Sequence, residues 1–426
     1  METKTLAEIG TVVTGKTPST SRRDYYGGDV PFITPTELHA GRTVGQSAKT
    51  LSEAGLQSIK GSILEGTSVL VGCIGWDIGN IAMTNDRCAS NQQINAVTSI
   101  ISEVNPSYLY YWLSTKKDYL FSIASVTRTP ILSKSTFEQV KVPVPSRDVQ
   151  DGIAHILVSI DDQIATNDQV NDNLYAMLQT LYGYWFLQFD FPDENGQPYR
   201  SSGGRMVWNN QLKREIPAGW RVGANEELFD GIRTGLNPRQ NFSLRTQGIA
   251  YLTVKNLTKD GGLDFASCDY IDEEAMEKVR RRSDLRVGDI LFASIAPLRR
   301  CFLIYEEPRD WEINESVFSI RPRRGVTTPE YVYCHLMSDA FVKQAEQSST
   351  GSIFKGIRHE TLKGLMTVIP PETVAQSYAS AVSPIMRMRN DNLEENRKLQ
   401  ELRDWLLPML MNGQATVASS DKLSFT

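Results

Sequence analysis

Eight residues near the N-terminus match a nucleotide-binding motif. Residues 10–17 read Gly-Thr-Val-Val-Thr-Gly-Lys-Thr, which fits the phosphate-loop pattern GxxxxGK followed by Ser or Thr. Such a loop holds phosphate only when a helix begins directly after it, because the helix N-terminus aims backbone N–H groups at the anion. Here Pro18 follows, and a second copy of the segment has Leu-Asn at 236–237 in place of Lys-Thr at 16–17. A nucleotide-dependent enzyme is therefore kept only as an alternative.

The segment 105–108, Asn-Pro-Ser-Tyr, has the outline of the Asn-Pro-Pro-Tyr signature of amino-methyltransferases. Its third residue differs, and no Gly-rich cofactor loop precedes it. Asn and Thr are preferred helix N-caps and Pro is favoured at the first helical position, so this segment and its counterpart Thr328-Pro329 predict helix starts. The adjacent Asp161 and Asp162 have no matching acids in the second copy. We expect no catalytic residues in this chain.

The sequence around these motifs occurs twice. Residues 105–110 are repeated in outline at 328–333, and the Pro-containing segment 142–145 is repeated at 368–371. The separation between matching segments drifts only from about 219 to about 226 residues. This spacing indicates one unit duplicated once, and not a solenoid of many repeats.

Each copy has the same internal order, which predicts the fold class. Short β-rich runs broken by Gly, Pro, Asn and Asp come first, a Pro-initiated amphipathic helix follows, and a Pro-punctuated strand leads into a long helix. We therefore predict an α+β fold of two mixed α/β domains, each followed by a long helix. The expected parts are a first domain at 1–149, a first long helix at 150–189, a linker at 190–219, a second domain at 220–371, a second long helix at 372–413 and a flexible tail at 414–426.

The two long helices carry heptad patterns that predict a coiled coil. Expected a positions are Ile160, Asn167, Leu174 and Leu181 in the first helix and Ile385, Asn392, Leu399 and Leu406 in the second. Expected d positions are Gln163, Val170, Met177 and Tyr184 in the first and Met388, Glu395, Leu402 and Met409 in the second.

Asn167 and Asn392 occupy corresponding a positions. A lone polar residue on an apolar seam penalises wrong register, so we expect the two helices to pair, antiparallel across the linker and with pseudo-two-fold symmetry. The alternative is that each Asn faces solvent at the edge of a looser seam. A helix of about 35 residues is about 50 Å long, enough to act as a ruler between two domains.

Composition limits the class of protein. Hydrophobic residues make up 40% and charged residues 22%, which is typical of a globular protein. No apolar run approaches the roughly 20 residues that span a bilayer, and the N-terminus lacks a signal-peptide core, so we expect a cytoplasmic protein. The five cysteines form no CxxC pair, and only four histidines are present. We expect free, mostly buried thiols and no metal site.

The net charge of −5 hides an uneven distribution. Residues 1–149 carry 14 basic and 13 acidic groups and residues 220–370 carry 21 of each, whereas residues 150–219 carry 4 basic and 9 acidic groups. Within the two neutral domains arginines gather, as at 278–286 and 321–324. Such clusters can supply the salt-dependent part of DNA affinity, and the alternative is that they are solvated faces.

The order of these elements resembles the DNA specificity subunit of type I restriction-modification systems. The likeness rests on two variable domains each leading through a Pro-punctuated strand into a long helix, and on the Ile-Pro-Ala-Gly-Trp entry at 216–220. The run from Gly15 to Thr34, with Tyr-Tyr-Gly-Gly-Asp at 25–29, is also similar to the first target-recognition domain of that family. The first domain departs from the pattern because it lacks the Ile-Pro-x-Gly-Trp entry.

This resemblance implies a reader and scaffold without catalytic chemistry. Each target-recognition domain would read one half of a split, asymmetric sequence in double-stranded DNA, and the helices would fix the unread spacer. Two modification subunits would dock on the helices and bring S-adenosylmethionine, and restriction subunits would bring ATP and Mg for translocation and cleavage. No cofactor is expected in this chain.

Base edges are read by side chains such as Arg, Lys, Asn and Gln, while phosphate contacts position the domain. We expect the DNA-contacting residues in loops at equivalent places of both copies, with a plain surface role as the alternative for each. The candidates are Lys16, Arg22, Arg23, Thr36, Arg128 and Lys134 in the first domain and Arg233, Arg239, Lys255, Asn256, Arg299, Arg300, Lys355 and Arg358 in the second. A coiled-coil scaffold whose domains bind protein is the competing function.

Overall fold

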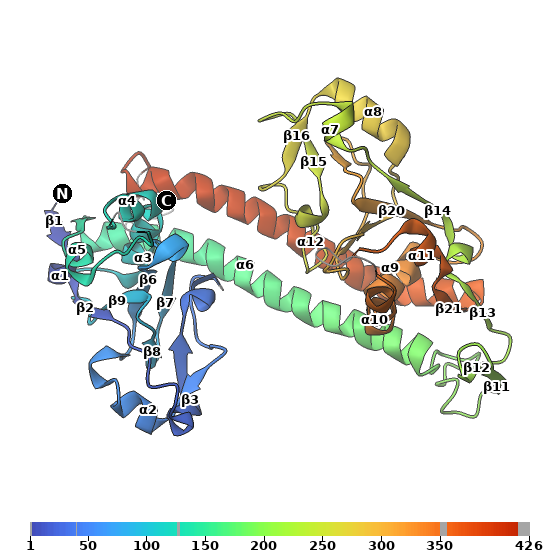
Figure 1. The fold of residues 1–426 in the computed structure, drawn as a ribbon, viewed down its shortest axis with the longest axis horizontal. Helices are drawn as coiled ribbons and strands as arrows, with labels where there is room; N and C mark the ends of the chain where they lie inside the picture. The colour runs from blue at the N-terminus through green and yellow to red at the C-terminus, as the bar shows by residue number, and fades with distance from the viewer. Residues whose placement is uncertain (1, 40, 126–127, 350–355, 416–426) are drawn as a thin grey trace, which may run out of the picture. The chain divides into compact units, whose positions relative to one another are not determined.

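The fold was analysed in a computed structural model that describes residues 2–39, 41–125, 128–349 and 356–415. The chain divides into two compact units: unit 1 is Met1–Thr166 with Asn396–Thr426, and unit 2 is Asn167–Glu395. Two long helices, α6 (Arg147–Tyr182) and α12 (Glu372–Met411), contribute residues to both units. Mixed helices and strands with two long helices confirm the predicted α+β class (Figure 1). Among the helices described, none combines the length and apolarity needed to cross a membrane.

Unit 1 contains three sheets. Its strands are β1 (Glu2–Thr5), β2 (Thr11–Thr14), β3 (Tyr26–Ile33), β4 (Thr50–Leu51), β5 (Ile63–Leu64), β6 (Ser68–Gly72), β7 (Ile81–Thr84), β8 (Cys88–Ser90), β9 (Ile94–Thr98) and β10 (Lys141–Val144). The strand orders are β1-β10, β2-β9-β6-β7 and β4-β3-β8-β5. All pairs are antiparallel except β3 with β8, which is parallel. Strands β6, β7 and β9 are buried at every residue, which makes the second sheet the centre of the unit.

Short helices cover these sheets. They are α1 (Leu6–Ile9), η1 (Arg23–Tyr25), η2 (Pro35–His39), α2 (Glu53–Gln57), η3 (Lys60–Ser62), η4 (Gly75–Asp77), α3 (Pro106–Ser114), α4 (Lys117–Ser122) and α5 (Lys134–Glu138). The predicted start of α3 is confirmed, because the Asn105 side chain accepts hydrogen bonds from the backbone N–H groups of Ser107 and Tyr108, with Pro106 next in the chain. This helix buries Tyr108, Leu109 and Tyr111 in the core of the unit.

Unit 2 repeats the arrangement. Its strands are β11 (Met206–Asn209), β12 (Arg214–Pro217), β13 (Arg221–Ala224), β14 (Phe229–Thr234), β15 (Ile249–Leu252), β16 (Asp269–Ile271), β17 (Ile290–Ala293), β18 (Cys301–Leu303), β19 (Trp311–Ile313), β20 (Val317–Pro322) and β21 (Met366–Ile369). The orders β13-β21 and β14-β20-β17-β18 match the first two sheets of unit 1, and β16-β15-β19 matches the strands β4-β3-β8 of the third, with β15 again parallel to β19. The duplication inferred from sequence is therefore confirmed in strand order.

The helices of unit 2 follow the same order. They are η5 (Gly183–Leu187), η6 (Asn225–Glu227), α7 (Pro238–Asn241), η7 (Val254–Asn256), α8 (Glu273–Ser283), α9 (Pro329–Met337), α10 (Asp339–Ser348) and α11 (His359–Gly364). Thr328 caps α9 by accepting a hydrogen bond from the backbone N–H of Tyr331, as the sequence predicted. The hairpin of β11 and β12 is an addition between α6 and the repeated part.

The entry motif at 216–220 has a structural reason. Gly219 has a φ of +87°, which favours glycine, and it turns the chain so that Trp220 enters the core. The Trp220 ring stacks on Phe191 at a centroid distance of 5.0 Å and meets Phe189 edge to face at 5.5 Å. Aromatic pairs of this geometry contribute about 0.5–1.5 kcal/mol each beyond their buried area. The motif therefore packs the start of the second domain against the segment that follows the first long helix.

The long helices run antiparallel within each unit. In unit 2 the Asn167 Nδ2 donates to Glu395 Oε2 at 3.1 Å and the Asn392 Nδ2 donates to Asn171 Oδ1 at 3.0 Å. The two asparagines therefore lie on the seam, each bonded to a residue of the opposite helix, and neither faces solvent alone. In unit 1 the Asn396 side chain donates to the carbonyl of Ile164 at 3.4 Å.

The predicted heptad frame is wrong on one side. The expected d residues Val170, Met177, Met388 and Leu402 are 37%, 49%, 54% and 43% exposed. Of the a residues, Ile160 and Asn167 are buried and the other six are half-buried. The second seam row follows the e positions Ile164, Asn171 and Leu178 in α6 and Arg389, Asn396, Arg403 and Leu410 in α12. Four of these seven residues are polar. A heptad assignment that requires apolar seam residues therefore favours the d positions over the e positions that form the seam.

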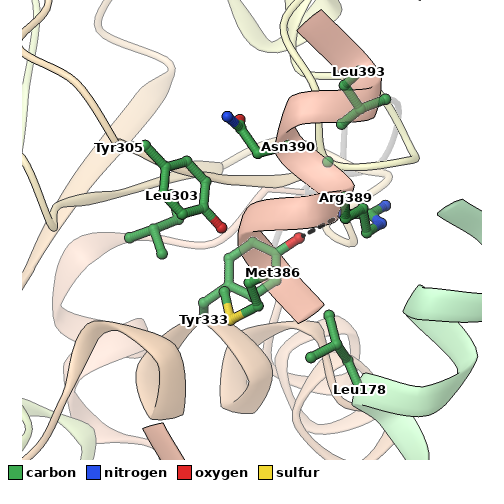
Figure 2. A pocket seen from close by; sticks show the side chains of 9 residues that line it. Leu178, Leu303, Tyr305, Tyr333, Met386, Arg389, Asn390 and Leu393 are labelled. Carbon is green, nitrogen blue, oxygen red and sulfur yellow. Dashed lines mark hydrogen bonds between the residues drawn. The ribbon is translucent and has the colours of Figure 1, made fainter. Parts of the chain in front are cut away.

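One of these polar seam residues joins the second domain to α12 within unit 2. Arg389 is buried, donates to the carbonyl of Asp260 and to the Tyr333 hydroxyl, and lies over the Tyr175 ring at 5.2 Å. Figure 2 shows the cavity beside it, lined also by Leu303. Its volume of about 10 Å³ holds about one water molecule, which is too little for a substrate or cofactor. Arg389 is therefore a residue that positions the domain on its helix.

A buried histidine completes the same core. The His335 Nδ1 lies 3.0 Å from the Tyr182 hydroxyl and the His335 Nε2 lies 3.1 Å from Asn225 Oδ1. Burial lowers the pKa of His335 to about 4, so the ring is neutral at pH 7. A neutral ring accepts from the tyrosine hydroxyl and donates to the amide oxygen. His335 is thus a structural link between α9, α6 and η6.

Candidate nucleic-acid interface

In each unit the same strand ends meet at one edge of the central sheet. Strands β2 and β6 are both antiparallel to β9, so the carboxyl ends of β2 and β6 flank the amino end of β9. Strands β14 and β17 flank β20 in the same way. A loop leaves from each of these three ends, and a fourth loop joins them through a backbone bridge. We name this edge the strand-end rim. It comprises 15–23, 73–80, 91–93 and 128–134 in unit 1 and 235–239, 294–300, 314–316 and 356–358 in unit 2.

Hydrogen bonds join the loops of the unit 1 rim. The Lys16 N–H donates to the Ser90 carbonyl at 2.8 Å, and the Thr17 hydroxyl donates to Gln92 Oε1 at 2.7 Å. The Cys73 N–H donates to the Gln93 carbonyl at 2.8 Å, and the Cys73 carbonyl accepts from the Leu132 N–H at 2.8 Å. The rim is therefore a connected surface held by its own backbone.

The unit 2 rim has the same connections. The Gly235 N–H donates to the Asn314 carbonyl at 3.1 Å, the Ser294 N–H donates to the Ser316 carbonyl at 3.1 Å, and the Ile357 N–H donates to the Ser294 carbonyl at 2.9 Å. The bridge between Ile74 and Ile131 in unit 1 corresponds to a bridge between Ile295 and Gly356 in unit 2. The order of contacts between loops is therefore conserved between the two copies.

The strand-end rim also accounts for the phosphate-loop match. A Cβ added at Gly15 would lie 2.1 Å from the Asn91 carbonyl oxygen, and one added at Gly235 would lie 1.6 Å from the Ile313 carbonyl oxygen. Glycine is needed in both copies because the loop after the first strand approaches a neighbouring strand end closely. Residues 15–22 form no helix, so the backbone donors of a phosphate loop do not converge here.

The rim of unit 1 gathers five of the six residues predicted in the first domain. Lys16, Arg22, Arg23, Arg128 and Lys134 all lie on it and are exposed. Arg22 forms an ion pair with Asp24 at 2.7 Å and Lys134 forms one with Glu138 at 3.7 Å. Exposed pairs contribute little to stability because water screens the charges, so both cations can exchange these partners for a phosphate at small cost.

The sixth residue, Thr36, lies beside this rim. It is exposed on η2, whose last residue His39 lies 3.2 Å from Asp77 Oδ1 of the loop 73–80. In unit 2 the counterpart η7 contacts the rim through Arg300, whose Nη1 donates to the Val254 carbonyl at 3.2 Å. Each rim therefore has a fifth segment at its side.

Unit 2 places the predicted residues less uniformly. Arg239 and Arg358 are exposed on the rim, and Lys255 is exposed on η7. Arg233, Arg299 and Arg300 are half-buried and bonded to Asp284, Asp339 and the Val254 carbonyl. Lys355 lies outside the described residues.

Asn256 is a correction to the prediction. Its side chain is fully buried: Oδ1 accepts from the Thr253 N–H at 2.9 Å, and Nδ2 donates to the Asp264 carbonyl at 3.0 Å. In unit 1 Glu37 accepts from the Thr34 N–H in the equivalent turn. Asn256 therefore closes a capping turn inside the domain, where a base edge cannot reach it.

Part of the arginine clusters seen in the sequence is bonded inside unit 2. Arg280 is bonded to the fully buried Glu312 at 3.0 Å, and Arg321 is bonded to the buried Asp289 at 2.8 Å. Arg323 donates to the carbonyls of Glu226 and Phe229. Three of the seven arginines at 278–286 and 321–324 are thus bonded inside the domain, so fewer of them are available to face phosphate than the sequence suggested.

Two exposed rim residues escaped the sequence prediction. Trp76, on η4, is 89% exposed, and Gln92 is exposed between β8 and β9. Neither side chain carries a positive charge, so the criterion of cations in loops does not identify them. A tryptophan between two glycines within five residues, at 75–79, is the signal that could have identified this turn.

The five cysteines do not form part of this surface chemistry. All are free, four are buried, and Cys268 is partly buried, which confirms the expectation of free thiols. Burial raises the pKa of Cys73 to about 12 and that of Cys334 to about 12, so neither is a thiolate at neutral pH.

Comparisons with known proteins agree on one family. A family model described as the type I restriction modification DNA specificity domain matches residues 1–176. The MjaIX type I restriction enzyme specificity subunit of Methanocaldococcus jannaschii is 26% identical over 426 residues, covering 98% of this chain and 94% of that protein. The HindI specificity subunit of Haemophilus influenzae is 33% identical over 185 residues, covering 42% of this chain and 39% of that protein.

A solved structure has the same fold. The S subunit of a type I restriction-modification system from M. genitalium aligns with a TM-score of 0.59 at 13% sequence identity, covering 96% of this chain and 95% of that chain.

Proposed function

The chain belongs to the family of DNA specificity subunits of type I restriction-modification systems, and we propose that each of its two domains reads one half of a split, asymmetric DNA target. The observation that carries this proposal is the strand-end rim, built twice by the same strand ends and the same loop contacts. A surface present twice suits a ligand recognised at two places. The recognition domains in this proposal are residues 1–149 and 220–371.

The chemistry of the rims supports DNA as that ligand. Lys16, Arg23 and Arg128 on one rim and Arg239 and Arg358 on the other are exposed cations at loop positions. Lysine and arginine neutralise phosphates, and arginine also donates two hydrogen bonds to guanine in the major groove. Catalysis belongs in this proposal to the partner subunits, which would bring S-adenosylmethionine, ATP and Mg.

A binding experiment with point variants tests this reading. The chain is purified with its modification subunit, and binding to a randomised DNA library is measured for the parent, Arg239→Ala and Arg358→Ala. We expect the parent to select a two-part sequence. If the arginine contacts a base, its variant is expected to lose about 1–3 kcal/mol of binding free energy and to become less selective at that one base pair. If it contacts a phosphate, the variant is expected to lower the slope of log affinity against log salt concentration by about one.

The control is Arg281→Ala. Arg281 is 80% exposed on α8, outside the rim, and pairs only across its own helix with Glu277 at 3.7 Å. It is expected to bind as the parent does. A parent complex without any preference among DNA sequences contradicts the proposal and supports the alternative of a protein-binding scaffold.

The long helices supply a second surface, suited to the modification subunits. In unit 2 the expected d residues Val170 and Met177 on α6 and Tyr184 on η5 form an exposed stripe, on a flank other than the seam. In unit 1 Leu402 and Trp405 are exposed on α12, at 43% and 61%. Apolar stripes in contact with water mark interaction sites, and an amphipathic partner helix fits a stripe of heptad spacing. We assign these stripes to the docking of modification subunits.

A charge placed on the stripe tests the docking assignment. Met177→Glu is expected to weaken binding of the modification subunit by at least about tenfold, because an unpaired carboxylate would be buried in the contact. The matched control Gln169→Glu adds the same charge at an exposed position of α6 that lies about 80° around the helix from Met177, off the stripe. Affinity is measured by titrating one purified subunit with the other. Equal affinities for the two variants contradict the assignment.

A further inference from the structure

Trp76 is the most exposed large hydrophobic side chain described, at 89%. It lies on the loop 73–80 of the unit 1 strand-end rim, directly after β6. Exposing so large an apolar side chain forgoes about 1.5–3 kcal/mol of burial free energy. Because Trp76 lies exposed on a proposed binding surface, a ligand bound there would bury its ring and recover this free energy.

The loop holds Trp76 firmly. Gly75 and Gly79 have φ angles of +66° and +81°, and a Cβ at Gly79 would lie 2.8 Å from Lys117 Cα. The Gly75 N–H donates to the Pro130 carbonyl at 2.9 Å. The side chain therefore projects from a closed turn that packs against α4 and against the loop 128–134.

Side chains beneath the turn add to this rigidity. The Asp77 carboxylate accepts from the Asn80 amide at 3.0 Å and lies 3.2 Å from His39 Nε2. The Asn80 side-chain oxygen in turn accepts from Lys117 Nζ at 2.7 Å. The carboxylate of the turn is thus bonded through Oδ1 to the residues beneath it, which helps to hold the turn that carries Trp76.

The surroundings of Trp76 are aromatic and basic. Its ring stacks on Phe121 at a centroid distance of 6.1 Å and an interplanar angle of 19°. Lys117 contacts the turn from α4, and the exposed Arg128 lies two residues before Pro130. Cations beside an unpartnered aromatic face suit a ligand with phosphates and flat rings together, which is the chemistry of DNA.

The second unit differs at this point. The corresponding loop after β17 has Ala296 and Pro297 where unit 1 has Gly75 and Trp76, and it continues with Arg299 and Arg300. The two rims thus share a backbone plan and differ in chemistry.

We propose that Trp76 contacts the bases of the DNA half-target read by the first domain, stacking on a base or wedging into a base step. This inference rests on the proposed function. Recognition by the first domain would then depend on how easily that base step opens, as well as on hydrogen bonds to base edges. The second domain, which has no aromatic residue at this place, would read its half without such a wedge.

The test compares Trp76→Ala and Trp76→Phe with the parent, each in complex with the modification subunit and with the target DNA selected by the parent. Loss of the ring is expected to lower affinity about 10- to 100-fold, while phenylalanine keeps most of it. The salt slope should stay the same, because no phosphate contact is removed. With 2-aminopurine placed along the first half-target, the parent should raise fluorescence at one step and Trp76→Ala should not.

The matched control is Trp208→Ala, because Trp208 is 63% exposed on the hairpin of β11 and β12, which contributes no residue to either rim. It is expected to bind target DNA as the parent does. If the parent selects a DNA sequence and Trp76→Ala binds it equally well, the Trp76 inference fails and the proposed function stands. If Trp76→Ala instead loses only the modification subunit, the patch is a protein contact and the inference also fails. If the parent selects no sequence, the proposed function itself fails.

Discussion

Inserting one heptad into each long helix is expected to lengthen the unread spacer of the DNA target by about three base pairs and to leave both half-sequences unchanged. Seven residues add about 10 Å of helix, and base pairs are about 3.4 Å apart. A repeat of residues 160–166 after Thr166, with a repeat of residues 396–402 before Asn396, keeps matching seam layers opposite each other, because Asn396 bonds to the Ile164 carbonyl. The prediction rests on the proposed ruler role of the helices.

The lengthened target should bind less tightly than the parent target. Three base pairs also rotate the grooves by about 100°, while a heptad turns a helix pair by only about 20°. The DNA must therefore twist to present both halves, and this deformation costs free energy. The readout is the sequence selected from a library with spacers of varied length. A variant that selects different half-sequences contradicts the division of labour between helices and domains, and insertion into one helix alone serves as the control, because it breaks the seam register.

Much of the fold could be predicted from the sequence because its signals are local. The starts of α3 and α9 were predicted from Asn-Pro and Thr-Pro, since a cap needs only its own first turn. The duplication was visible because both copies keep glycine and proline where the backbone demands them, as at Gly15 and Gly235. The second copy also argued against a phosphate loop at 10–17, because it has Leu-Asn at 236–237 in place of Lys-Thr at 16–17.

The seam frame could not be predicted, because polar residues form part of the seam. Asn171, Arg389 and Asn396 are buried and bonded to the opposite helix, to a domain loop or to a backbone carbonyl. A rule that counts apolar residues treats such positions as exposed. Whether a polar seam residue can be buried depends on hydrogen-bond partners supplied by the opposite helix and the packed domain, and a single sequence does not show those partners.

The candidate site was predicted in outline and missed in detail. Loop position and charge found Arg239 and Arg358, which are exposed, but the same criteria selected Asn256, which is buried. Exposure depends on how a loop folds back on itself, as in the bonds of Asn256 to Asp264 and Ser267, which are eight and eleven residues away. Charge alone cannot separate a cation that faces DNA from one that neutralises a buried acid.

Arg321 is a cation that neutralises a buried acid. We expect Arg321→Met to lower the free energy of unfolding of unit 2 by about 3–5 kcal/mol. The side chains of Arg321 and Asp289 are 12% and 2% exposed, and two hydrogen bonds of 2.8 Å join them. Removal of the guanidinium leaves a buried carboxylate without its cation. The full chain is unfolded in urea, where the transition of unit 2 should move to a lower midpoint with little change in slope.

Arg286→Met is the matched control, because Arg286 binds Asp284, a carboxylate that also binds Arg321, but is 62% exposed. Its loss should cost less than about 1 kcal/mol, since water screens the pair. A double variant, Arg321→Met with Asp289→Leu, should recover part of the stability, because an apolar pair replaces the buried ions. Equal effects of Arg321→Met and Arg286→Met would mean that burial does not set the strength of these pairs.

The same variant separates internal arginines from DNA-facing ones. At a temperature where Arg321→Met is still folded, its salt slope for target DNA should equal that of the parent, because its guanidinium is bonded to Asp284 and Asp289. If Arg239 contacts a phosphate, Arg239→Ala should lower the slope by about one, although it removes the same charge. The arginines of the second domain therefore divide by burial into those that hold the domain together and those exposed to a ligand.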